Sequence, residues 1–147
     1  MKDVAATPTA DVCRLLNLLH AARKIEERLE DALGEVGLSL AKMGVLAKLA
    51  DADEPIPLSL LAERCACVRS NITQLVDRLE DDGLVRREPD PDDRRSIRAT
   101  LTAEGRERHL AGRDVLVGEV SVMVERIGGE FPTAVLEAVE RLGDRAK

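Results

Sequence analysis

Residues 69–74 place polar side chains of several shapes at the start of a predicted helix. An arginine fork matches O6 and N7 of guanine, the amide of asparagine or glutamine matches N6 and N7 of adenine, and a threonine methyl group can contact thymine. Serine and threonine hydroxyls also suit phosphate oxygens. Such side chains can also form an ordinary solvated helix surface, but the charged hairpin predicted after this helix favours contact with base edges in the major groove of duplex DNA. The candidate DNA-contacting residues are Arg69, Ser70, Asn71, Thr73 and Gln74.

The elements that position these side chains are predicted between Ser59 and Thr102. Apolar residues recur there at helical spacing, first over a short helix that ends near Cys65 and then over a second helix at 68–81. The second helix stops before Gly83, because glycine readily takes the left-handed conformation that follows a helix C-terminus. Two short helices around a tight turn predict a helix-turn-helix.

Two short strands joined by a charged loop follow the second helix. The apolar pattern predicts them at 84–85 and 97–101, and residues 56–58 are a candidate third strand. The loop contains two prolines among aspartates and arginines, with Arg94 and Arg95 at its tip. Taken alone, such a hairpin would more often be a solvated turn. After a helix-turn-helix it is a wing, so the predicted fold class is mainly α with a small β-wing.

The same segment resembles the DNA-binding lobe of the MarR family of bacterial transcription regulators. Three features in order carry the resemblance. They are the helix end VDRLE at 76–80 followed by GLV at 83–85, the wing Asp92-Asp93-Arg94-Arg95, and LTAEG at 101–105, which opens the next helix. Together with the predicted helical flanks, they extend the resemblance over nearly the whole chain.

The resemblance implies a role for the wing tip. In the family, the arginine of an Asp-x-Arg triplet enters the minor groove, and the aspartate pairs with a basic residue of the lobe. The triplet here is Asp93-Arg94-Arg95, which makes Arg95 the candidate for insertion, Asp93 its brace and Arg78 the partner of Asp93. A narrow minor groove concentrates negative potential and so attracts arginine. Arg78, Arg94 and Arg95 therefore join the predicted DNA-binding residues.

Composition argues against several other classes of protein. A chain of 147 residues with 44% hydrophobic and 34% charged residues fits one domain with its own core. No apolar run is long enough to cross a membrane, and three cysteines are too few for a disulfide framework, so we expect a cytoplasmic protein. One phenylalanine, without tryptophan or tyrosine, argues against stacking on single-stranded nucleic acid. The sequence contains neither a glycine-rich phosphate-binding loop nor a nucleophile elbow, so we do not expect an enzyme, and no cofactor is predicted.

The formal net charge of −6 is unfavourable for a protein that must replace the counterions of DNA phosphates. The distribution of charge decides the question, however, and arginines cluster in the predicted lobe, where acidic residues also occur. We therefore expect modest affinity for non-specific DNA.

Four further helices are predicted, the second within the lobe and the other three on either side of it. Their ranges are 9–35, 39–50, 102–127 and 131–145, with Ser39 and Thr102 as N-caps of the second and third. An apolar stripe along a helix of roughly 25 residues, nearly 40 Å long, needs more cover than a small monomer supplies. The resemblance implies a two-fold dimer built from the chain ends, and an intramolecular bundle is the alternative.

The predicted organisation is a single MarR-like domain over 1–147. Dimerisation helices occupy 10–36 and 102–147, and the winged helix-turn-helix lobe occupies 39–101. The resemblance further implies a small-molecule effector, such as an aromatic acid, bound between the dimer helices and the lobe. The candidate lining residues are Leu16, Leu19, Met43, Leu46 and Leu116, with Arg23 or Lys42 as anion contacts.

The cysteines are candidates for a thiol or metal sensor. Cys67 lies at the start of the second lobe helix beside Arg69, where the helix dipole and the guanidinium favour a thiolate. Cys65 is too close to Cys67 for an easy disulfide, and Cys13 stands alone on the first helix. A structural role for the cysteines is favoured over sensing. The single histidines, His20 and His109, have no ligand set around them, so no metal site is predicted.

These observations predict a homodimeric DNA-binding transcription regulator, a repressor that reads a palindromic operator and is released by a small-molecule effector. Two alternatives come from different features of the sequence. One is a redox- or metal-responsive regulator that uses Cys13, Cys65 or Cys67. The other is a winged-helix module for protein interaction without DNA binding, which would fit the acidic balance.

Overall fold

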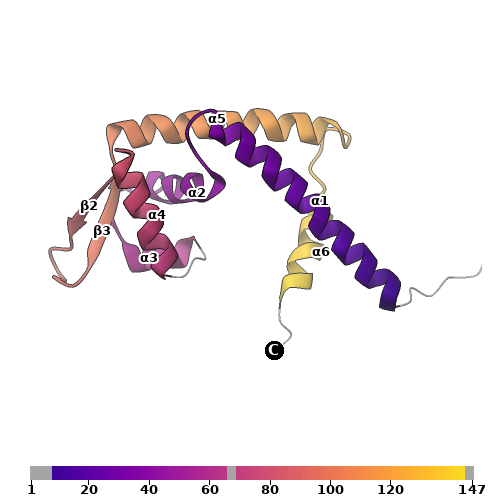
Figure 1. The fold of residues 1–147 in the computed structure, drawn as a ribbon, viewed down its shortest axis with the longest axis horizontal. Coiled ribbons are helices and arrows are strands. Elements are labelled where there is room, and N and C mark those ends of the chain that lie inside the picture. Colours follow the sequence, from indigo (N-terminus) through magenta and orange to yellow (C-terminus); the bar gives the residue numbers. More distant parts are fainter. Residues whose placement is uncertain (1–7, 66–68, 145–147) are drawn as a thin grey trace, which may run out of the picture.

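The computed structural model describes residues 8–65 and 69–144, the side chains of 8, 69 and 70 excepted. Within these ranges no helix is both long enough and apolar enough to cross a membrane. Figure 1 shows a lobe of short helices and a small sheet at one end of a long helix, with two further helices directed away from the lobe. The helices are α1 (Pro8–Gly34), α2 (Leu40–Ala50), α3 (Leu58–Arg64), α4 (Arg69–Asp81), α5 (Ala103–Glu125) and α6 (Thr133–Gly143). The strands are β1 (Ile56–Pro57), β2 (Val85–Pro89) and β3 (Ile97–Leu101).

The three strands form one antiparallel sheet in the order β1-β3-β2. The pairing of Ile56 with Ala99 confirms the predicted third strand beside the wing. Strand β2 is longer than predicted and pairs with β3 as far as Pro89, opposite Ile97. The sequence obscured this length because charged residues occupy both surfaces of the strand after Val85. The wing loop therefore begins at Asp90, whose N–H donates to the Ser96 carbonyl at 2.9 Å.

The hydrophobic core belongs to the lobe. Side chains from α2, α3 and α4 meet beneath the sheet and are fully buried, among them Leu46, Leu61, Ile72 and Leu79. Leu33, near the end of α1, joins the same core and connects the long helix to the lobe. The amphipathic spacing recognised in the sequence is therefore the spacing that buries one surface of each lobe helix.

The N-caps of α2 and α5 and the end of α4 lie at the residues predicted from the sequence. The Ser39 hydroxyl accepts from the Lys42 N–H at 3.1 Å at the start of α2. The Thr102 hydroxyl accepts from the Gly105 N–H at 2.9 Å and donates to the Gly83 carbonyl at 2.7 Å. Gly83 itself has φ +75°, the left-handed conformation expected after α4. Both predicted N-caps and the predicted helix stop are thus confirmed.

The flanking helices expose much apolar surface in this single chain. α1 contacts α5, where Arg28 pairs with Glu119 at 2.7 Å. Further toward the chain ends the two helices diverge, and α6 has no buried residue (Figure 1). The exposed apolar residues of α1 include Val12, Leu15, Leu16, Leu19 and Ile25, and those near and on α6 include Phe131, Val135, Leu136, Val139 and Leu142.

Candidate nucleic-acid interface

Helix α4 divides into a buried surface and an exposed one. Ile72, Val76 and Leu79 are fully buried in the lobe core. Asn71, Gln74 and Arg78 are exposed, and the intervals of three and four residues between them place all three on one surface of the helix. Thr73 is half-buried beside this surface. Arg69 and Ser70 belong to the first turn of α4, and their side chains lie outside the described atoms.

The wing tip is shaped by its own carboxylates. The Asp90 carboxylate accepts from the Asp92 N–H at 2.9 Å, and that of Asp93 accepts from the Arg95 N–H at 3.0 Å. Arg94 and Arg95 are exposed. Within the described part of the chain no ion pair joins Asp93 to Arg78, so this pairing stays a prediction. Asp93 holds the tip through a local side chain to backbone hydrogen bond, which the tight reversal of the loop makes more accessible than a side chain on α4.

Helix α4 and the wing share a hollow of about 230 Å³. Thr73 lines it from α4, Arg95 and Ser96 line it from the wing, and Arg87 lines it from β2. Figure 1 shows the β2–β3 hairpin beside α4 at the same end of the lobe. The predicted groove-reading helix and the predicted inserting arginine are therefore brought to one side of the molecule. A polar helix surface next to a basic loop can contact adjacent grooves of a duplex.

Ion pairs inside the described part of the lobe neutralise four of its carboxylates. Arg98 pairs with Glu88 at 2.7 Å between the two wing strands. Lys42 on α2 pairs with Asp82 at 2.6 Å, just beyond the end of α4. A third basic residue, Arg87, pairs with two acidic residues of α4.

The exposed arginines of α4 and the wing do not form close ion pairs with carboxylates in the described part of the chain. Arg78, Arg94 and Arg95 have no ion pair within the described ranges, and Arg86 reaches Glu88 only at 4.0 Å. Four aspartates of the same region also have no ion pair within the described ranges, so the surface formed by α4 and the wing carries charges of both signs. They are Asp81, Asp90, Asp92 and Asp93. This mixture of charges is the one expected from the sequence, and the modest affinity for non-specific DNA stays a prediction.

Sequence reasoning assigned no role to Arg87. Its backbone N–H donates to Glu80 at 3.1 Å, its Nε donates to Glu80 at 2.7 Å, and its Nη1 contacts Asp77. The hydrogen bonds from the backbone and side chain of Arg87 lower the pKa of the Glu80 carboxyl. The three-residue interval between Asp77 and Glu80 was the only signal in the sequence, because it puts both carboxylates on one surface of the helix.

The predicted effector residues do not share one surface in this chain. Met43 and Leu46 are buried in the lobe core, and Leu116 packs against that core. Leu16 and Leu19 are each 59% exposed on α1, and Arg23 is also exposed there. In this single chain Met43 and Leu46 are thus enclosed by the core, and their part in an effector site stays a prediction. The apolar surface of α2 is already used by the core of its own lobe.

The two cysteines that the structure describes, Cys13 and Cys65, lie at different helices. Cys13 is exposed on α1, Cys65 is half-buried at the C-terminal end of α3, and Cys67 lies outside the described residues. Among the residues that the structure does describe, no group of three or more histidine, cysteine, aspartate or glutamate side chains could hold a metal ion.

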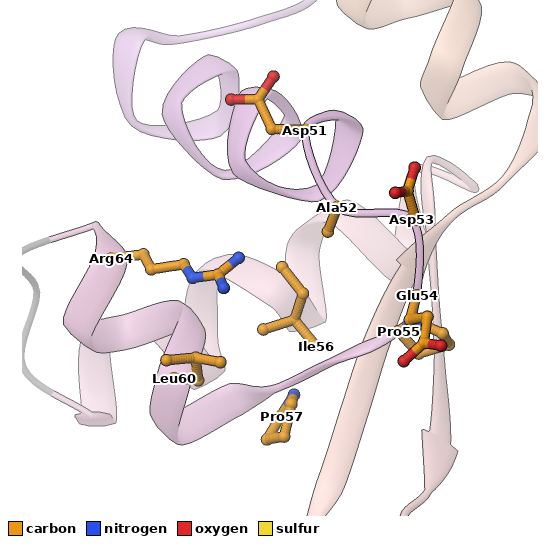
Figure 2. Close-up of a pocket in the computed structure, with 9 residues that line it drawn as sticks. All are labelled: Asp51, Ala52, Asp53, Glu54, Pro55, Ile56, Pro57, Leu60 and Arg64. Carbon is orange, nitrogen blue, oxygen red and sulfur yellow. The ribbon is translucent and has the colours of Figure 1, made fainter.

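A second hollow, of about 520 Å³, lies between the α2–β1 loop and α3. Figure 2 shows Arg64 reaching toward its centre from α3, with Asp53 and Glu54 across from it on the loop. No ion pair within the described ranges joins these charges. The hollow therefore has no set of side chains that converge on one point, and we assign no site to it.

Comparison with known proteins identifies the family of this chain. A model of the MarR family matches residues 38–97. The chain is 33% identical to the transcriptional repressor MdtR of Bacillus subtilis over 84% of this chain and 77% of MdtR. It is 35% identical to the repressor YetL of the same organism over 63% of this chain, but that match spans only 56% of YetL.

A solved structure agrees over most of the fold. The crystal structure of Sco3205, a MarR family regulator of Streptomyces coelicolor in complex with DNA, matches with a TM-score of 0.80 and 28% identity, over 92% of this chain and 89% of that one. These relatives are named as regulators and not as enzymes, in agreement with the prediction. The chain therefore belongs to the MarR family of transcription regulators.

Proposed function

We propose that this protein is a homodimeric transcription regulator that binds a palindromic DNA operator and acts in the cytoplasm as a repressor. The hollow shared by Thr73 of α4 and Arg95 of the wing is the observation that carries the proposal. Helix α4 reads base edges in the major groove through its exposed surface, and Arg95 enters the neighbouring minor groove. The repressor assignment is supported by the names of MdtR and YetL.

The apolar surfaces of α1 and α6 support the dimer. Leu16 on α1 is 59% exposed and Leu142 on α6 is 67% exposed, and neighbours of the same type surround both. Exposed apolar surface of this extent marks an interface with another chain. A two-fold axis through the chain ends presents two lobes to half-sites about one helical turn apart, roughly 34 Å.

We further propose that a small-molecule effector changes the spacing of the two lobes. A ligand can shift the equilibrium between two lobe spacings only by the difference between its binding free energies for them. Leu16, Leu19 and Arg23, which face outward on α1, remain candidates for its site once a second subunit covers that helix.

Selection of bound duplexes from a random pool tests the proposed function. We expect a palindrome with half-sites one helical turn apart, bound more weakly as salt rises because counterions are released on binding. A protein-interaction module would select no sequence.

Arg95→Ala tests the role of the wing. Loss of one groove contact should weaken binding of the selected duplex, measured by fluorescence anisotropy, about tenfold to a hundredfold. Arg113→Ala, which removes an exposed arginine of α5 away from α4 and the wing, is the matched control and should bind like the wild type. Equal affinity of Arg95→Ala and the wild type would contradict the assignment.

A further inference from the structure

Arg87 joins strand β2 of the wing to helix α4. Its Nε and Nη2 each lie 2.7 Å from Oε2 of Glu80, and its backbone N–H donates to Oε1 of the same carboxylate at 3.1 Å. Its Nη1 contacts Asp77, one turn earlier on α4. One side chain of β2 is therefore held by two carboxylates of α4 and by hydrogen bonds in more than one direction.

The chemistry of arginine suits this position. The planar guanidinium presents several N–H groups at fixed angles, so it can bind two carboxylates at once, whereas a lysine ammonium on a flexible stem cannot hold the same geometry. The Arg87 side chain is only 33% exposed, and those of Asp77 and Glu80 are 46% and 35% exposed. Partial burial reduces the screening by water that weakens ion pairs on an open surface.

The location of Arg87 connects this contact to DNA binding. Arg87 lines the hollow that Thr73 and Arg95 also line. Asp77 follows Thr73 by four residues, just over one helical turn and about 6 Å along the same surface of α4. Without the Arg87 side chain, the carboxylates of Asp77 and Glu80 next to the groove-reading residues would lose their ion pairs. The backbone N–H of residue 87 would still donate to Glu80, so the contact between α4 and β2 would be weakened and the charge of the two carboxylates left uncompensated.

We propose that Arg87 is a positioning residue for operator recognition, which locks α4 to the wing at a fixed angle and neutralises Asp77 and Glu80 beside the DNA. The proposal rests on the proposed function, because the angle between α4 and the wing matters only for a sequence that the protein selects. Arg87 acts through the two carboxylates and does not itself bind phosphate.

A set of full-length variants tests this role against two duplexes, the palindrome selected by the wild type and a scrambled duplex of equal length. Arg87→Ala should weaken binding of the palindrome about tenfold to a hundredfold, and that of the scrambled duplex much less. Arg87→Lys should bind the palindrome with an affinity between those of the wild type and Arg87→Ala, because lysine keeps the positive charge but lacks the planar fork of N–H groups. In the Asp77→Asn, Glu80→Gln background, Arg87→Ala should cost far less than in the wild type, since its partners are already neutral.

Each other result would overturn the proposal. An equal loss on both duplexes that is unchanged in the neutral background would mean that Arg87 contacts phosphate directly. A lower urea midpoint with unchanged affinity for both duplexes would mean that Arg87 only stabilises the fold. If Arg87→Ala does not fold, the test relies on Arg87→Lys and on the Asp77→Asn, Glu80→Gln double variant. The proposal requires that both discriminate less between the palindrome and the scrambled duplex than the wild type does. A wild-type protein that selects no sequence would instead refute the proposed function.

Discussion

Replacing Gly105 by alanine should destabilise the junction between the lobe and the long helix α5. A Cβ built at Gly105 would lie 1.8 Å from the carbonyl oxygen of Leu84 and 2.8 Å from its carbonyl carbon. The neighbouring atoms are backbone, which cannot rotate away as a side chain can. The Leu84 carbonyl also accepts a hydrogen bond from the Thr102 N–H at 3.1 Å, so this second contact holds it in place.

The magnitude follows from two opposing effects. Overpacking of this kind costs about 3 kcal/mol, the upper part of the usual range, because the backbone must move by on the order of 1 Å. Alanine returns about 1 kcal/mol, because glycine is a poor residue within a helix. The expected net loss in the free energy of unfolding is about 2 kcal/mol, or roughly 1 M in the urea midpoint.

Urea unfolding followed by circular dichroism measures this loss, at one protein concentration because a dimer is stabilised by mass action. Gly44→Ala is the matched control, since Gly44 also lies inside a helix but an added Cβ would have no atom within 4 Å beyond the adjoining residues and the backbone of its own helix. It should gain about 0.5 to 1 kcal/mol from helix propensity alone. If Gly105→Ala unfolds at the same urea concentration as the wild type, the close approach of α5 to Leu84 is refuted.

Two further variants test the dimer and the pH dependence of stability. Leu136→Glu places a charge in the exposed apolar surface of α6, where the wild-type side chain is 47% exposed; sedimentation equilibrium should show a monomer, and a persistent dimer would place the interface elsewhere. Burial lowers the pKa of His109, and the charges of Arg113 and Arg106 lower it further. The unfolded chain therefore binds the proton more readily, and stability should fall as the pH drops through about 6.5. Urea midpoints at pH 7.5 and 5.5 should differ less for His109→Gln than for the wild type, and an equal difference would exclude His109 as the cause.

Most of the fold could be predicted from local patterns. The N-caps Ser39 and Thr102, the helix stop at Gly83 and the order of helices and strands depend on hydrogen bonds and apolar spacing within a few residues. The shared surface of Asn71, Gln74 and Arg78 follows in the same way from the geometry of one helix. Such features need no knowledge of distant segments.

Only the tertiary structure decided how distant charges pair and which apolar residues are buried. Arg87 meets Asp77 and Glu80 because β2 packs beside α4, while Asp93 turns to its own loop and leaves Arg78 free of an ion pair within the described residues. Leu46 looks the same in sequence whether it lines a cleft or fills a core, and packing placed it in the core. The physical reason is that a side chain has several partners of suitable type along a chain, and only the folded backbone selects the one within reach.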